Sequence, residues 1–217
     1  WAGGKHKLVP FIESHLPTKA RKRLIEPFAG SAALSIALEF ESYLLNDISA
    51  DLICLFSALK SEREQFIRYA RSFFTPQNNN DSRFYELRER FNNSNNPIER
   101  AALFVYLNRH AFNGLCRYNS QGRFNVPFGK YKAPYFPEVE MSAFVRKSTR
   151  IELSCNDFQT TLDKVEDCDT VYCDPPYVPL SETASFTAYA QGGFAHDDQI
   201  RLSEAAEQTA QTSQGVL

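Results

Sequence analysis

The sequence predicts an α/β fold in which a doubly wound parallel sheet is interrupted by an inserted subdomain. Short apolar segments alternate with helical segments near both ends of the chain. Between them, the pattern changes to amphipathic helices and then to a loop region rich in glycine, asparagine and aromatic residues. Alternating strands and helices are typical of a parallel sheet with helical crossovers. We therefore expect the sheet domain to comprise residues 1–60 and 141–217, and the insertion to comprise residues 61–140.

The N-terminal elements predict a βαβ unit. An apolar segment at 23–27 predicts a strand, the small residues at 28–32 predict a tight turn, and residues 33–38 predict a helix. A second strand is expected at 43–47, with a helix after it over about 49–60. These elements would place two strand ends at the same edge of a sheet.

The remaining elements follow from the same patterns. Residues 62–107 read as amphipathic helices, and residues 108–137 read as loops and hairpins punctuated by glycine. Strands resume at 150–155 and 169–173, and a helix is expected over about 197–208. An open parallel sheet normally continues for several more strands, so we expect a fragment that lacks both of its natural termini.

Composition excludes several classes of protein. Hydrophobic residues make up 43% and charged residues 23% of the chain, which excludes disordered, collagen-like and coiled-coil proteins. No apolar run approaches the roughly 18 residues that a membrane span needs. The net charge of −2 excludes a uniformly basic nucleic-acid-binding protein. The five cysteines are an odd number and lie too far apart in the sequence to form paired CxxC zinc ligands. They predict free thiols, no metal site and a cytoplasmic location.

The turn at residues 28–32 is the first candidate site. Small residues let a ligand approach the backbone of such a turn. Asp47 lies 17 residues beyond Gly30, close to the spacing at which a carboxylate after the second strand binds a ribose. The GxGxxG fingerprint is absent, because Ala32 stands where a further glycine is expected. Taken alone, the turn fits a nucleoside site and a purely structural strand-to-helix turn equally well.

The second candidate site is the motif Asp174-Pro175-Pro176-Tyr177, which directly follows an apolar strand. The carboxylate of Asp174 and the carbonyl of Pro175 could accept two hydrogen bonds from one exocyclic amine, and Tyr177 offers a ring for stacking. The two prolines stiffen the turn. This combination favours a pocket for an amino-bearing heterocycle over an exposed turn of an edge strand.

The third feature is a basic and aromatic stretch. No acidic residue occurs between Glu99 and Glu138. Local positive charge interleaved with aromatic rings indicates contact with the phosphates and bases of a nucleic acid. The alternative is a solvated loop whose aromatic residues belong to the core. The cations of the stretch are Arg100, Arg109, Arg117, Arg123, Lys130 and Lys132.

These motifs, in this order, resemble those of the Dam-type DNA adenine-N6 methyltransferases of the alpha class. The resemblance is carried by Phe28-Ala29-Gly30, Asp47, the segment at 108–119, Asp174-Pro175-Pro176-Tyr177 and the opening Trp1-Ala2-Gly3-Gly4-Lys5. It covers nearly the whole chain. It implies a Rossmann-like S-adenosylmethionine-dependent methyltransferase sheet with an inserted helical and hairpin target-recognition subdomain. It also implies duplex DNA as the substrate, GATC as the target and an adenine that is flipped out of the helix.

The resemblance assigns roles to individual residues. For catalysis it implies Asp174, Pro175, Pro176 and Tyr177. For S-adenosylmethionine it implies Trp1, Lys5, Phe28, Ala29, Gly30, Ser31, Ala32, Asp47, Asp157, Phe158 and Asp174. For DNA it implies Arg109, Phe112, Asn113, Leu115, Arg117, Asn119, Arg123, Pro127 and Lys130. Among these, Arg117 is expected to contact a guanine and Phe112 to wedge into the base stack, whereas Arg109, Arg123, Lys130 and Lys132 are expected to hold phosphates.

Two alternatives stay open at this point. The chain could methylate another exocyclic amine, such as cytosine N4 or an adenine in RNA, although Asp rather than Ser at position 174 favours adenine. It could also be a truncated, DNA-binding module without turnover. The resemblance implies no metal, no covalent enzyme intermediate and no obligate protein partner. It leaves open whether the role is repair, gene regulation, phage modification or restriction–modification.

Overall fold

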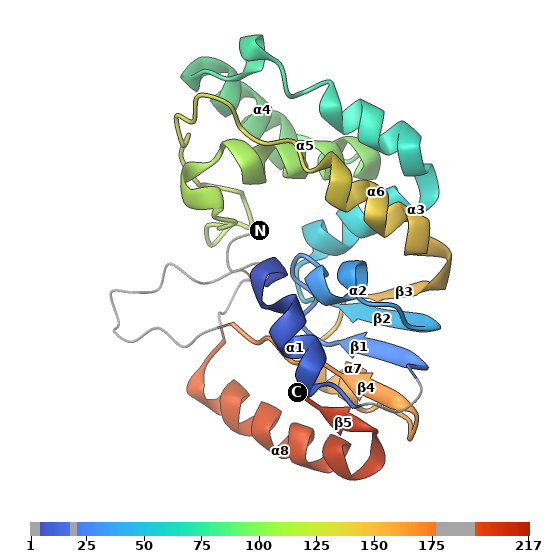
Figure 1. Cartoon of the computed structure of the whole chain (residues 1–217). Coiled ribbons are helices and arrows are strands. Elements are labelled where there is room, and N and C mark those ends of the chain that lie inside the picture. Colours follow the sequence, from blue (N-terminus) through green and yellow to red (C-terminus); the bar gives the residue numbers. More distant parts are fainter. Residues whose placement is uncertain (1–4, 18–20, 177–193) are drawn as a thin grey trace. The chain divides into compact units, whose positions relative to one another are not determined.

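The structure is a computed structural model that describes residues 5–17, 21–176 and 194–217 (Figure 1). These residues form two compact units. The sheet unit takes in the described residues up to Ala50 and from Arg150 onward, and the helical unit runs from Asp51 to Thr149. The sequence expects the insertion at 61–140, so the compact helical unit extends further in both directions. The functions assigned to the two parts stay predictions.

The sheet unit contains a five-stranded parallel sheet in the order β3-β2-β1-β4-β5 within the described residues. This confirms the α/β class, and β5 adds a strand to the four that the sequence predicts. The order reverses direction at β1, where β2 and β4 lie on either side, so the ends of β1, β2 and β4 share one edge. The strands are β1 (Arg23–Glu26), β2 (Ser42–Asn46), β3 (Ile151–Ser154), β4 (Asp169–Val171) and β5 (Gly215–Val216).

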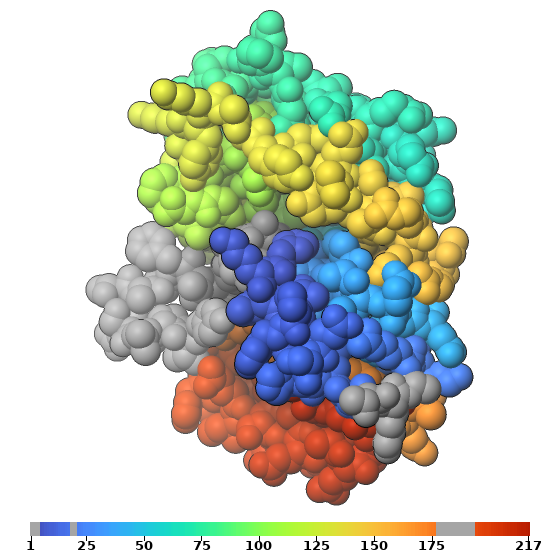
Figure 2. Space-filling view, viewed as in Figure 1, coloured from blue at the N-terminus to red at the C-terminus, as the bar shows by residue number. Residues whose placement is uncertain are grey.

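Helices cover this sheet and complete its core. Ile25, Leu44 and Val171 lie on neighbouring strands and are almost fully buried against Leu202 of α8. In Figure 1, α1 lies in front of the strands, and Figure 2 shows the atoms of this helix and its neighbours covering much of the sheet from that side. The helices are η1 (His6–Leu8), α1 (Val9–His15), α2 (Ala33–Ala37), α7 (Phe158–Leu162) and α8 (His196–Thr212), with η4 (Ser148–Arg150) at the start of β3.

The helical unit is built around α5, whose residues 101–107 are all buried. The side chain of Asn96 caps this helix by accepting hydrogen bonds from the backbone N–H groups of Ile98 and Glu99 at 3.0 and 3.1 Å. Pro97 occupies the first turn, where its missing N–H has no cost. The helices are α3 (Ala50–Arg71), η2 (Pro76–Asn78), α4 (Asp81–Asn93), α5 (Pro97–His110), η3 (Phe112–Gly114) and α6 (Glu138–Lys147).

Helix α3 joins two helical segments that the sequence predicts separately, one over about 49–60 and the next from residue 62 on. They meet at a kink at Arg63, where φ is 52° and ψ is −127°, and the second segment ends at Arg71. The stacking of Phe56 on Phe144 of α6, with ring centroids 4.8 Å apart, fixes its first half in the unit. None of the helices in the described ranges is both long enough and apolar enough to span a membrane.

Residues 111–137 are mostly irregular, as their composition predicts. Two isolated antiparallel bridges, Ala111 with Phe128 and Tyr118 with Phe124, are the regular pairings that the structure records there. Helix α4 holds this segment through side chains. Asn92 bonds both the N–H and the carbonyl of Phe124, at 2.8 and 3.1 Å, and Arg88 donates to the carbonyl of Val126 at 3.2 Å.

Candidate functional site

The turn after β1 is fixed by a carboxylate at the end of β2. Asp47 accepts hydrogen bonds from the N–H of Gly30 at 3.0 Å and from the N–H of Ser49 at 2.9 Å. The N–H of Ala29 donates to the carbonyl of Asn46 at 2.8 Å. Burial raises the pKa of Asp47, although the two N–H groups oppose the shift. The structure thus joins the two parts of the first candidate site.

Ala32 adopts a conformation that glycine favours. Its φ and ψ are 53° and 35°, in the left-handed region, and the residue is fully buried. This is the position at which a further glycine is expected. An alanine there carries a backbone cost on the order of 1 kcal/mol. The turn therefore keeps the left-handed backbone conformation that glycine favours, with some local strain at Ala32.

Glu26, directly before this turn, is a buried acid to which the sequence motifs assign no role. It is 2% exposed and accepts hydrogen bonds from both the N–H and the hydroxyl of Ser35 in α2. Desolvation raises the pKa of Glu26 to about 7, and the negative charge of Asp174 adds to the shift. An acid at the end of an otherwise apolar strand was the available signal.

Asp174 follows β4, beside the end of β1. The backbone leading to it is held on both sides, because the N–H of Tyr172 donates to Ile25 at 2.9 Å and the N–H of Cys173 donates to Leu217 at 2.8 Å. The ammonium group of Lys5 donates to Asp174 at 2.7 Å. The carboxylate is thus reachable by an N–H donor. Pro175 and Pro176 are described, whereas Tyr177 and Trp1 lie outside the described residues.

Three phenylalanines gather next to the turn. The ring of Phe28 lies 5.4 Å from that of Phe158 and 5.7 Å from that of Phe194, and the last two lie 6.0 Å apart. The sequence predicts the first two as cofactor residues. It missed Phe194, which belongs to no motif. Phe158 is 5% exposed and belongs to the core, so the partly buried Phe28 and Phe194 are the rings of this cluster that a planar ligand could contact.

Asp157, also predicted for the cofactor, is engaged in local structure. Its carboxylate caps α7 by accepting from the N–H of Gln159 at 2.9 Å, and it binds Arg201 at 2.7 Å. The guanidinium of Arg201 also lies 4.9 Å from the centre of the Phe158 ring. Asn156 is tied to β2 by two hydrogen bonds with the side chain of Asn46, at 3.0 and 2.9 Å.

In the helical unit, a cavity of about 340 Å³ lies beside several residues predicted for DNA. Arg109 donates from Nε to the carbonyl of Tyr135 at 2.9 Å, and its guanidinium lies 5.2 Å from that ring. The N–H of Asn113, which has φ of 54°, donates to the hydroxyl of Tyr131 at 2.9 Å. Phe112 is 50% exposed. The lining includes Asn108, Arg109, Asn113, Gly114, Tyr131 and Tyr135.

Gly129 lets the Tyr131 ring approach the backbone. A Cβ at position 129 would lie 2.4 Å from Cε2 of Tyr131 and 2.9 Å from the carbonyl oxygen of Ala111. The N–H of Gly129 donates to the carbonyl of His110 at 2.8 Å. The segment around Gly129 (yellow in Figure 2) lies at the surface of the helical unit. The wall of the cavity therefore depends on a residue without a side chain.

Arg117 and Asn119, both predicted to contact DNA, lie on a short hairpin, residues 117–125. Arg117 donates from Nε to the side chain of Asn125 at 2.8 Å. The side-chain oxygen of Asn119 accepts from the N–H groups of Gln121 and Arg123, both at 3.0 Å. Asn119 therefore shapes the hairpin tip, so any contact with a base would come from its amide nitrogen.

The cations of the acid-free stretch differ in their surroundings. Arg100 lies in an ion pair with Asp51 inside the unit, so it does not contribute a surface charge as the sequence suggests. Arg123 pairs with Glu89 at 2.6 Å. Within the described residues, Lys130 and Lys132 are exposed and form no ion pair.

The other two predicted DNA residues border the hairpin. Leu115 is half-buried and follows η3. Pro127 is exposed, and its carbonyl accepts from the N–H of Phe112 at 2.9 Å. The described residues contain no group of three or more His, Cys, Asp or Glu side chains that could hold a metal ion.

Comparisons with known proteins bear on this arrangement. A family described as "D12 class N6 adenine-specific DNA methyltransferase" matches residues 1–216. A "DNA adenine methylase" of Vibrio cholerae is 47% identical over 210 residues, which cover 97% of this chain and 75% of the relative. Proteins with the same description from Serratia marcescens and Escherichia coli K12 are 49% and 45% identical, over 96% and 95% of this chain and 76% and 74% of the relatives.

Proposed function

The chain belongs to the D12 class N6 adenine-specific DNA methyltransferases, and from this premise we propose that its methyl donor is S-adenosylmethionine and its target a flipped-out adenine in GATC. The activity itself, methylation of adenine in DNA, follows from the family, and the resemblance seen in the motifs is confirmed. The observation that carries the finer proposal is the shared edge of β1, β2 and β4, where Asp47 and Asp174 lie.

The residues around the β1 turn fit a nucleoside cofactor. Asp47 holds the turn at Gly30 and carries the carboxylate that would meet ribose hydroxyls. The rings of Phe28 and Phe194, which pack on Phe158, would flank the adenine. When bound, S-adenosylmethionine supplies an electrophilic methyl group on a sulfonium. The other cofactor residues that we propose are Trp1, Lys5, Ala29, Ser31, Ala32 and Asp157.

Asp174 and Pro175 would act on the target amine. In the proposed mechanism, the carboxylate of Asp174 and the carbonyl of Pro175 each accept one N6–H hydrogen bond. The nitrogen lone pair is thereby kept out of the ring and directed at the methyl group, so that positioning and charge complementarity accelerate the transfer. The contact between Lys5 and Asp174 supports this role, because it demonstrates an N–H donor at that carboxylate. Pro176 and Tyr177 would complete the pocket.

The helical unit would read the DNA. We propose that Arg117 contacts a guanine, that Phe112 fills the space left by the flipped adenine, and that Lys130 holds a phosphate. The exposure of Phe112 and Lys130 supports these roles. The further proposed contacts are Arg109, Asn113, Leu115, Asn119, Arg123, Pro127 and Lys132.

Methyl transfer to defined duplexes tests the proposal. Labelled S-adenosylmethionine is incubated with the protein and a duplex that contains GATC or a scrambled site, and the modified nucleoside is then identified. We expect N6-methyladenine in GATC duplexes only. N6-methyladenine in both duplexes would overturn the proposed target sequence, and transfer to cytosine N4 or to RNA would overturn the proposed substrate. Duplex binding without transfer by the folded protein would favour a DNA-binding module without turnover.

A further inference from the structure

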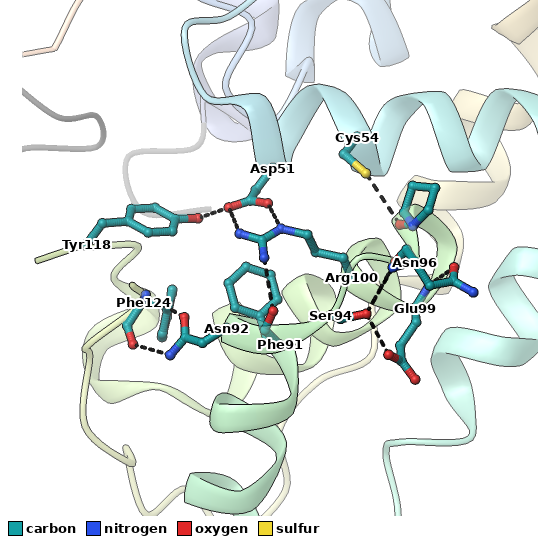
Figure 3. Close-up of polar contacts among 11 residues, drawn as sticks. Asp51, Cys54, Phe91, Asn92, Ser94, Asn96, Glu99, Arg100, Tyr118 and Phe124 are labelled. Atoms are coloured by element: carbon teal, nitrogen blue, oxygen red, sulfur yellow. Dashed lines mark hydrogen bonds and ion pairs between the residues drawn. The ribbon is translucent and has the colours of Figure 1, made fainter. Parts of the chain in front are cut away.

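A buried carboxylate at the start of α3 connects three elements of the helical unit. Asp51 is 9% exposed, and its two oxygens accept from Nε and Nη2 of Arg100 in α5, at 2.5 and 3.1 Å. One of these oxygens also accepts from the hydroxyl of Tyr118, at 2.6 Å. Figure 3 shows the carboxylate between the guanidinium group and the phenol ring. A carboxylate this deeply buried needs such partners, because an unpaired buried charge is strongly destabilising.

Arg100 is itself fixed on its remaining side. It donates from Nη1 to the carbonyl of Phe91 at 3.0 Å, and its guanidinium lies 4.2 Å from the centre of the Phe91 ring. The ion pair is therefore anchored to the end of α4 as well as to α3 and α5. A hydroxyl bound to this pair is therefore tied to three helices of the unit.

Tyr118 lies on the hairpin between Arg117 and Asn119. Residues 117–119 pair with 123–125 through one isolated antiparallel bridge and two backbone hydrogen bonds. In such a pairing, successive side chains point to opposite faces. Tyr118 and its bridge partner Phe124 face inward, with ring centroids 5.8 Å apart at 90°, and Phe124 is 1% exposed. Arg117 and Asn119 consequently belong to the other face, the one proposed to meet base edges.

We propose that Asp51 and Tyr118 are positioning residues for DNA sequence discrimination. Their hydrogen bond fixes where the hairpin holds Arg117 and Asn119 relative to the helices of its unit. The inference rests on the proposed function of the hairpin and adds two residues that contact no base. Asn92 of α4 fixes the hairpin at Phe124, through hydrogen bonds to both backbone groups of that residue. The hydrogen bond of 2.6 Å from Tyr118 to the carboxylate of Asp51 fixes a second point, on the strand that carries Arg117 and Asn119.

Tyr118→Phe tests this inference, because it removes the hydroxyl and leaves the ring and the pair of Asp51 with Arg100. The measurement is kcat/KM for methylation of a GATC duplex divided by kcat/KM for duplexes with one base pair of the site changed. We expect this ratio to fall at least about fivefold, as for the loss of one base contact. A merely structural role would lower the active fraction equally for all duplexes and leave the ratio unchanged.

Glu99→Gln is the matched control. Glu99 neighbours Arg100 on α5 and binds Arg90 at 3.0 Å and Ser94 at 2.6 Å. Among the described residues, its carboxylate forms no hydrogen bond or ion pair with the hairpin, and Figure 3 shows it directed at Ser94. We expect its ratio to equal that of the wild type. An unchanged ratio in Tyr118→Phe, or an equal fall in Glu99→Gln, overturns the inference. Asp51→Asn should reproduce the fall, and if this variant does not fold, Tyr118→Phe alone decides.

The wild-type arm separates this inference from the proposed function. If the wild type does not discriminate between the duplexes, the proposed target sequence fails, and the positioning role fails with it. If the wild type discriminates and Tyr118→Phe keeps the full ratio, only the positioning role fails.

Discussion

In the sheet unit, Asp174 follows a strand whose backbone is hydrogen bonded on both sides, whereas in the helical unit Arg117 and Asn119 lie on a hairpin that side chains hold. The N–H groups of Tyr172 and Cys173 donate to backbone carbonyls of neighbouring strands. The hairpin instead depends on Asn92, Arg88 and Asp51. We therefore expect a substitution near the sheet site to change methyl transfer with little change in structure. A substitution near the hairpin should change both the structure of the hairpin and the function that depends on it.

The largest expected effect is on the sheet side. Asp174→Ala removes an acceptor for the target amine, and we expect methyl transfer to fall at least about a hundredfold. The side chains of Lys5 and Asp174 are 17% and 27% exposed, so we expect the loss of their ion pair to change the free energy of unfolding by less than about 2 kcal/mol. Turnover and urea denaturation measure the two effects. Full turnover, or a large loss of stability, would contradict the difference that we propose between the two units.

A buried acid gives the sheet unit a particular dependence on pH. The pKa of Glu26 is raised from 4.5 to about 7, so its contribution to stability is present below pH 4.5 and is lost as pH rises through 7. The shift corresponds to about 3 kcal/mol. In Glu26→Gln the side chain is neutral at every pH, so we expect this part of the pH dependence to vanish. Urea denaturation of both proteins at pH 5 and pH 8 measures it, and equal pH dependence would contradict the prediction.

The helical unit holds a buried base with the opposite behaviour. His110 is 1% exposed, and its ring stacks on Tyr106 with centroids 3.9 Å apart. Desolvation lowers the pKa of His110 from 6.5 to about 4. Its contribution to stability is therefore present above pH 6.5 and is lost as pH falls toward 4. The two units respond to acid with opposite signs at these two residues.

Asn92 tests whether one side chain holds the hairpin. Asn92→Ala leaves the N–H and the carbonyl of the buried Phe124 without their partner, so we expect a loss of about 2 kcal/mol of stability. It should also lower discrimination between DNA sites. Asn93→Ala is the control, because the exposed side chain of Asn93 accepts one hydrogen bond from Arg123, at 3.1 Å, and no other within the described residues. We expect a change below about 0.5 kcal/mol. Equal effects of the two variants would show that packing, and not the hydrogen bonds of Asn92, holds the hairpin.

The smallest expected effect concerns the strained turn. Ala32→Gly relieves a left-handed alanine while it adds freedom to the unfolded chain, so we expect a change in stability within about 1 kcal/mol and no net loss. Ala33→Gly, in the first turn of α2, should lose about 1 kcal/mol. Thermal unfolding of the two variants compares them. A greater loss of stability in Ala32→Gly than in Ala33→Gly would show that the backbone of Ala32 is not strained.

The sheet could be predicted from the sequence because its strands are apolar segments that alternate with helices. Part of the site could be predicted because Asp47 and Asp174 directly follow two of these strands. Phe194 and Ser35 could not be predicted, because no motif marks them. The contact of Asn92 with Phe124 joins residues 32 positions apart, and that of Asp51 with Tyr118 joins residues 67 apart. No local periodicity records such pairings, since they arise only when α3, α4 and α5 pack together.

Gly129 has a consequence for engineering. Any side chain at this position would clash with both the Tyr131 ring and the backbone at Ala111. A library designed to redirect the sequence preference of the enzyme should therefore randomise exposed neighbours such as Lys130 and leave residue 129 constant. Variants with another residue at position 129 would lose the structure of this loop, so a selection would remove them whatever DNA sequence they prefer.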